Sequence, residues 1–173
     1  MNRPKQPRIL VPRLIALAAL LGFTLSLLVH IAALLGTDVS AKFPYVWTLH
    51  VGIFVVFFPF IFFSRKDLGP KPTFAQIREF FPSWVVALGC VIAAYTAINF
   101  LLFIVGMQGG SPAISEGKFI LQDHGRLVRE VTAAEYTSFK ANEVRGFSGH
   151  WLLFYFVPFA YFMFGKQSNL SAD

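Results

Sequence analysis

Residues 14–36 read LIALAALLGFTLSLLVHIAALLG and contain no Asp, Glu, Lys or Arg. About 20 helical residues are enough to cross the roughly 30 Å of hydrocarbon in a bilayer. Three further apolar runs, at 43–64, 83–107 and 147–164, also lack charged residues. Only 14% of the 173 residues are charged, whereas a typical soluble domain has about 25%. The sequence therefore predicts an all-α membrane protein in which residues 1–173 form a single domain with four transmembrane helices.

The distribution of Lys and Arg predicts how these helices are oriented. Connections on the cytoplasmic side carry an excess of basic residues close to the helix ends. The connection between the first two runs contains only Lys42. The N-terminal tail and the second connection are rich in basic residues, namely Arg3, Lys5, Arg8, Arg13, Arg65, Lys66, Lys71 and Arg78. We therefore expect a multi-pass protein of the plasma (inner) membrane with both termini in the cytoplasm.

The connection at 108–146 predicts a small folded cap on the extracytoplasmic side. Residues 118–122 and 127–131 are short strand-like runs, and Asp123-His124-Gly125 between them is typical of a turn. Thr132 followed by Glu135 is a capping-box pattern that begins a helix. The predicted cap is a β-hairpin plus a helix, placed between the third and fourth transmembrane helices.

Small residues predict where the transmembrane helices approach one another, because close packing drives their association in lipid. The first run has a four-residue repeat of Ala18, Gly22, Ser26 and His30, and the third has Gly89, Ala93 and Ala97. The second and fourth runs are rich in Phe and contain Pro59 and Pro158. We expect the first and third helices to supply the contact faces and the other two to form bulky outer walls.

Four polar side chains recur at similar depths, one in each predicted helix. They are His30, His50, Asn99 and His150. On the inferred topology each lies about 5 to 12 Å below the outer boundary, at 1.5 Å per residue. Polar groups at membrane depth usually face the bundle interior and mark functional sites. This layer is therefore the candidate site.

The polar layer has two interpretations. Histidines on facing helices can hold a haem iron or a transition metal, which would make the chain an electron-transfer protein. Alternatively, the side chains hydrogen-bond one another, Tyr95 or a backbone carbonyl, and so fix the helix register. The sequence has no C-x-x-C-H haem-attachment motif, and the single Cys90 offers no cysteine-based metal site. We favour the second interpretation and expect no cofactor, with haem or a metal as the alternative.

The tetrapeptide Gly146-Phe147-Ser148-Gly149 stands at the start of the fourth predicted helix. It resembles the G-x-S-G serine motif of rhomboid intramembrane proteases, which implies Ser148 as a nucleophile. The match covers this tetrapeptide alone, and that family uses more transmembrane helices than are predicted here. A serine nucleophile needs a positioned base, and His150, two residues further on, would point away from Ser148 on one helix. An intramembrane serine hydrolase is our third hypothesis.

The net charge of +6 does not predict nucleic-acid binding, because the basic residues lie at the ends of apolar runs and are not grouped on one face. The leading hypothesis is a small integral membrane protein without detectable catalytic chemistry, acting as an accessory or structural subunit of a larger membrane assembly. Its expected partners are the lipid bilayer and other membrane protein subunits or further copies of itself.

Overall fold

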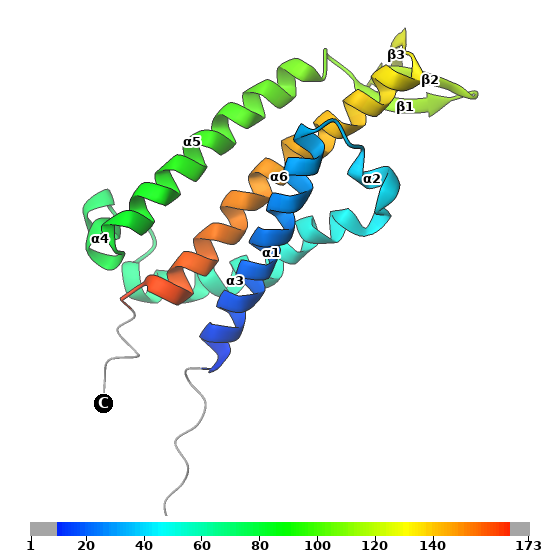
Figure 1. The fold of residues 1–173 in the computed structure, drawn as a ribbon. Coiled ribbons are helices and arrows are strands. Elements are labelled where there is room, and N and C mark those ends of the chain that lie inside the picture. Colours follow the sequence, from blue (N-terminus) through cyan, green and yellow to red (C-terminus); the bar gives the residue numbers. More distant parts are fainter. Residues whose placement is uncertain (1–9, 167–173) are drawn as a thin grey trace, which may run out of the picture.

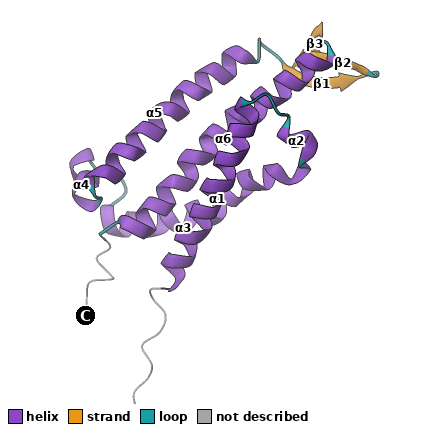
Figure 2. Cartoon of the chain, in the orientation of Figure 1, coloured by secondary structure: helices purple, strands orange, loops and turns teal. Residues whose placement is uncertain are grey.

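The computed structural model describes residues 10–166, and helices dominate its fold (Figures 1 and 2). Arg3, Lys5 and Arg8, which contribute to the predicted orientation, lie outside the described residues. The elements are α1 (Leu10–Leu34), α2 (Val39–Lys42), the 3-10 helix η1 (Pro44–Trp47), α3 (Thr48–Leu68), α4 (Phe74–Phe80), α5 (Ser83–Gly106), β1 (Ser111–Ser115), β2 (Lys118–Asp123), β3 (Arg126–Glu130) and α6 (Ala133–Phe164).

Within residues 10–166, four helical segments are long and apolar enough to cross a membrane, namely Leu10–Leu34, Pro44–Leu68, Ser83–Gly106 and Ala133–Phe164. The prediction of four such helices is therefore confirmed. Their start and end residues agree with the predicted runs to within a few positions, except for the N-terminus of α6. That helix begins fourteen residues before the predicted 147–164 run, because the expected cap helix and the fourth predicted helix are one continuous element of 32 residues.

Helix α6 is the centre of the bundle. It lies between α5 on one side and α1 with α3 on the other (Figure 1). In its most apolar window 56% of the residues are buried, against 28% in α1, 17% in the segment Pro44–Leu68 formed by η1 and α3, and 11% in α5. The expectation of an outer wall is therefore wrong for α6, although it describes α3.

The physical reason is that glycines on the neighbouring helices make room for the aromatic side chains of α6. A Cβ built on Gly22 of α1 would lie only 2.2 Å from the Tyr155 ring, and one built on Gly52 of α3 would lie 2.5 Å from its hydroxyl. That hydroxyl donates to the Leu49 carbonyl at 2.6 Å. Tyr155 therefore fills the space between α1 and α3, and large residues belong to the core of this bundle.

The predicted contact faces differ between the two small-residue helices. On α1, Gly22 and Ser26 are buried as expected, whereas Ala18 is exposed. On α5 the prediction is wrong, because the buried residues are Val85, Thr96 and Asn99; Ala93 and Ala97 are exposed and Gly89 is half-buried. Turning Thr96 and Asn99 toward α6 spares polar groups from facing lipid, and this outweighs the close packing of alanines.

The cap contains a three-stranded antiparallel sheet in the order β1-β2-β3. The predicted hairpin is present as β2 and β3, joined by His124-Gly125. The first strand was not predicted, although it too is joined by a two-residue turn, Glu116-Gly117. All four turn residues have positive φ, as two-residue type I′ hairpin turns require.

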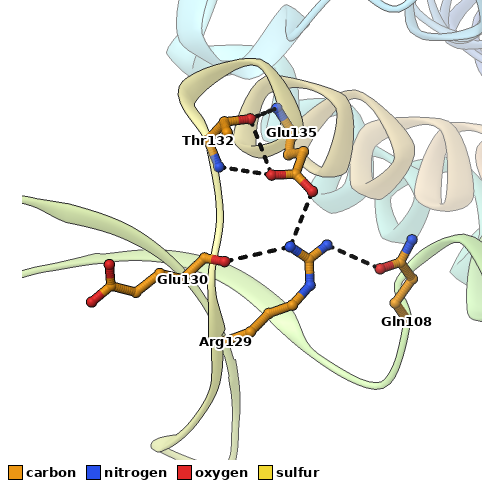
Figure 3. Close-up of polar contacts among 5 residues, drawn as sticks. All are labelled: Gln108, Arg129, Glu130, Thr132 and Glu135. Atoms are coloured by element: carbon orange, nitrogen blue, oxygen red, sulfur yellow. Dashed lines mark hydrogen bonds and ion pairs between the residues drawn. The ribbon is translucent and has the colours of Figure 1, made fainter.

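Polar contacts fasten the sheet to the start of α6 (Figure 3). Thr132 and Glu135 form the predicted capping box, with both reciprocal hydrogen bonds present. Arg129 on β3 donates to the Glu135 carboxylate at 3.0 Å and to the Gln108 side chain at 3.1 Å. Leu121 on β2 is fully buried beneath the sheet. The cap is therefore built as one unit with α6.

Candidate functional site

The predicted polar layer separates into two groups in the structure. His30 and Asn99 are buried, each with 2% of its surface exposed. His50 is exposed and His150 is half-buried. The buried pair lies where α1, α5 and α6 meet, whereas the other two histidines line a groove between α3, α5 and α6. Similar depth in the sequence therefore does not place all four side chains in one site.

Both ring nitrogens of His30 have hydrogen-bond partners. Nδ1 lies 2.8 Å from the Ser148 hydroxyl on α6. Nε2 lies 2.5 Å from the Tyr95 hydroxyl on α5, and the two rings meet edge to face with centroids 5.5 Å apart. One histidine therefore ties α1 to both neighbouring helices, and Tyr95 is one of the partners that the sequence predicted.

The protonation pattern of this cluster follows from its donors. The Ser148 hydroxyl donates to the Arg145 carbonyl at 3.2 Å, so its oxygen accepts the hydrogen bond that His30 Nδ1–H donates. In a neutral imidazole the other nitrogen is then an acceptor, and it receives the Tyr95 hydroxyl. This tautomer gives each of the three side chains its hydrogen bonds within the cluster.

Asn99 and Thr96 extend the cluster along α6. The Asn99 amide donates to the carbonyls of Arg145 and Gly146, at 3.2 and 3.5 Å. The Thr96 hydroxyl donates to the Gly149 carbonyl at 3.1 Å. A Cβ on Gly149 would lie 2.2 Å from the Asn99 amide nitrogen. The missing side chain at Gly149 therefore lets α5 approach closely enough to bond the backbone of α6.

Ser148 of the G-x-S-G tetrapeptide has a histidine within reach, but it is His30 from α1. His150 instead donates to the Gly146 carbonyl at 2.9 Å, in keeping with the prediction that it points away from Ser148. Ser148 is fully buried, and its backbone lies within the continuous helix α6, where amides are used by the helical ladder. In the tautomer derived above, His30 donates to Ser148 and does not act as its base.

The second group faces a largely apolar groove with a volume of about 510 Å³. Its walls are mainly phenylalanines of α3, α5 and α6, and His50 and His150 are its polar residues. The Trp151 indole donates to His50 Nδ1 at 3.1 Å. Within residues 10–166, no cluster of three or more His, Cys, Asp or Glu is arranged to hold a metal ion.

Comparisons with protein-family models, with curated proteins and with solved structures find no match to this chain. The site is therefore interpreted from its own chemistry. Sequence reasoning missed Ser148 as the partner of His30, because 118 positions separate them and no local pattern links them. It also missed Thr96. The signal that could have revealed it is its spacing of three residues from Asn99, which places both side chains on one face of the helix.

Proposed function

We propose that the chain is a non-catalytic integral membrane protein that serves as an accessory or structural subunit of a larger membrane assembly. The observation that carries this proposal is the unequal burial of the helices. Only 11% of the most apolar window of α5 and 17% of that of the segment Pro44–Leu68 are buried, against 56% in α6. Long open helix faces support a role in which a partner subunit or a second copy packs against them.

The closed hydrogen bonding of the buried cluster supports the non-catalytic part of the proposal. Both ring nitrogens of His30 are engaged, by Ser148 and Tyr95. A histidine that is an axial haem ligand needs a free ring nitrogen. A histidine that is a general base needs an unprotonated ring nitrogen facing the nucleophile. Each role would first have to break this cluster. A cluster of this kind fixes helix register instead.

The cap offers a second surface for association. Ile114 on β1 and Leu127 on β3 are each 61% exposed, and Val128 is 47% exposed. Strand β3 is also an edge of the sheet, with backbone groups that can pair with another chain. Apolar residues on such a surface favour contact with another protein.

Site-specific photocrosslinking in native membranes tests the proposal. Benzoylphenylalanine would replace Val91 or Leu101 on α5, and Leu21 on α1 would be the matched control, since all three are more than 60% exposed. We expect the α5 positions to crosslink to one discrete polypeptide and the α1 position to lipid alone. Equal crosslinking at all three positions, a stoichiometric haem in the purified protein, or labelling of Ser148 by a fluorophosphonate would contradict the proposal.

The orientation is also part of the proposal, with the α4 end in the cytoplasm and the cap outside the inner membrane. Four basic residues in the last turn of α3 and in the connection that follows it support this orientation, namely Arg65, Lys66, Lys71 and Arg78. In a Cys90→Ser background, Arg126→Cys should react with an impermeant thiol reagent in intact cells, and Lys71→Cys should react only after permeabilisation. The reverse pattern would mean that the chain is inserted with the opposite orientation.

A further inference from the structure

The groove between α3, α5 and α6 has a polar end and an apolar length. His50 and Ile61 both line it, and the eleven residue steps of α3 from one to the other correspond to about 16 Å along the helix. Phe54, Phe58 and Phe100 are among the aromatic side chains along this length. The groove is therefore shaped for an elongated apolar molecule with a polar group at one end.

The two histidines present opposite hydrogen-bonding atoms. The Trp151 indole donates to His50 Nδ1 at 3.1 Å, so in the neutral ring the proton of His50 is on Nε2, which is a donor. His150 Nδ1 donates to the Gly146 carbonyl at 2.9 Å, so its Nε2 is an acceptor. Among the hydrogen bonds of residues 10–166, none uses either Nε2 atom.

A hydroxyl group matches this pair, because its oxygen accepts one hydrogen bond while its proton is donated to another acceptor. The groove lining contains no Asp, Glu, Lys or Arg. A charged headgroup at this depth would have no counter-ion, and its desolvation would be costly. The chemistry of the groove therefore favours a neutral head over a phosphate or an ammonium group.

We propose that this groove binds a neutral membrane lipid with one hydroxyl head, a lipid alcohol. Its hydroxyl oxygen accepts from His50 Nε2 and its proton is donated to His150 Nε2. Its tail lies along the phenylalanines toward Ile61. The proposal is independent of the subunit role, because it requires only this chain and a bilayer.

Photolabelling of the purified full-length protein in nanodiscs tests the proposal with three probes that share one diazirine-bearing tail. The probes are a long-chain primary alcohol, its methyl ether and the corresponding alkane. We expect the alcohol to label groove peptides of α3 and α6 most strongly. The ether accepts but does not donate, so its labelling should be weaker and unaffected by His150→Leu. The alkane should label the groove no more than the rest of the lipid-facing surface.

Substitutions define the role of each histidine. His50→Leu and His150→Leu should each lower labelling by the alcohol about threefold to tenfold, the range expected for one hydrogen bond within a membrane. His50→Gln retains a donor and His150→Gln retains an acceptor, so both should label close to the wild-type level. His124→Leu, in the exposed cap turn, is the control. Neither groove histidine is buried, but His50→Leu leaves the buried Trp151 indole without its acceptor, so the folding of each variant is checked by circular dichroism before labelling.

Two labelling results would overturn the proposal. One is equal labelling of the groove by the alcohol and the alkane, and the other is alcohol labelling that is unchanged in the His50→Leu/His150→Leu double variant. Mass spectrometry of lipids that copurify from native membranes then identifies the occupant. Enrichment of a lipid alcohol over the double variant supports the proposal, and enrichment of a quinol alone would overturn it. The same lipids in both samples would also overturn it.

Discussion

Two sides of one short stretch of α6 show how similar residues acquire different roles. Ser148 and Gly149 face α1 and α5, where Ser148 contacts His30 at 2.8 Å and Gly149 accepts from Thr96 at 3.1 Å. His150 and Trp151 line the groove on the other side. Successive helix residues are rotated by about 100° from one another, so these four residues point around the whole circumference of α6. One turn of α6 therefore contributes residues both to the buried cluster and to the open groove.

The difference between the two sides is whether hydrogen-bonding capacity is left over. In the buried cluster each ring nitrogen of His30 already has a partner. In the groove, His50 and His150 each use only Nδ1 among the hydrogen bonds of the described residues. Groups whose capacity is satisfied by the protein contribute to stability, whereas groups with capacity left over contribute to binding. This comparison predicts that substitutions in the cluster change stability more than those in the groove.

The largest effect is expected from Gly149→Val. A Cβ at this position would lie 2.2 Å from Asn99 Nδ2 and 3.5 Å from His30 Cε1, so α5 would have to move away from α6. We expect a loss of about 3 kcal/mol, at the upper end for overpacking a core. Equilibrium unfolding in mixed detergent micelles measures this loss in the free energy of unfolding.

Gly89→Val is the matched control for Gly149→Val. Its Cβ would meet only the Phe156 ring, at an ordinary contact distance of 3.4 Å. The control should change stability by less than about 1 kcal/mol, because its Cβ meets no clash and valine has a higher helix propensity than glycine. Equal losses at the two positions would mean that α5 does not depend on the close approach at Gly149.

A smaller effect on stability is expected from replacing the histidines with leucine. His30→Leu removes a partner from both Ser148 and Tyr95 and should cost about 1 to 2 kcal/mol, the range for hydrogen bonds between transmembrane helices. His150→Leu removes one bond to a backbone carbonyl on its own helix and should change stability by about 0.5 kcal/mol or less. The same unfolding assay compares the two variants. A larger loss for His150→Leu would reverse the comparison.

The sequence predicted the four apolar helices because the absence of charge over a sufficient length is a local property. It also predicted that His30 and His50 lie within apolar helices, and their expected depth follows from counting residues along each helix. It did not predict which of them is buried, because rotation of a helix about its axis depends on its neighbours. Depth and direction are separate quantities, and only depth is encoded locally.

Two further features of the cap and the bundle were not predicted from the sequence, and each has a physical reason. Strand β1 contains Pro112, which argues against a central strand but is tolerated on the sheet edge that β1 occupies. The Glu116-Gly117 turn was the signal that could have revealed it. The central place of α6 was missed because Tyr155 is buried only through Gly22 and Gly52 on other helices. Long-range partners of this kind cannot be inferred from one segment.

The smallest effect concerns the cap, where polar contacts face water and not a buried interior. The backbone amide of Thr132 donates to the Glu135 carboxylate, and Arg129 lies beside it, so the pKa of Glu135 is held below its ordinary value of 4.5. A lowered folded-state pKa means that the carboxylate stabilises the cap above pH 4.5 and that this contribution is lost as the pH falls through the lower folded-state value. The cap should therefore loosen only in acid.

Amide exchange at the start of α6, corrected for the intrinsic pH dependence of exchange, measures this loosening. Protection across residues 133–140 should be constant above pH 4.5 and fall below it. Glu135→Gln keeps a capping-box side chain but does not titrate, so its protection should be lower at neutral pH and nearly independent of pH. Glu116→Gln, in the exposed turn between β1 and β2, should retain the wild-type profile. A wild-type fall in protection that persists in Glu135→Gln would assign the acid sensitivity to a different carboxylate, and the contacts of Figure 3 would then not be its cause.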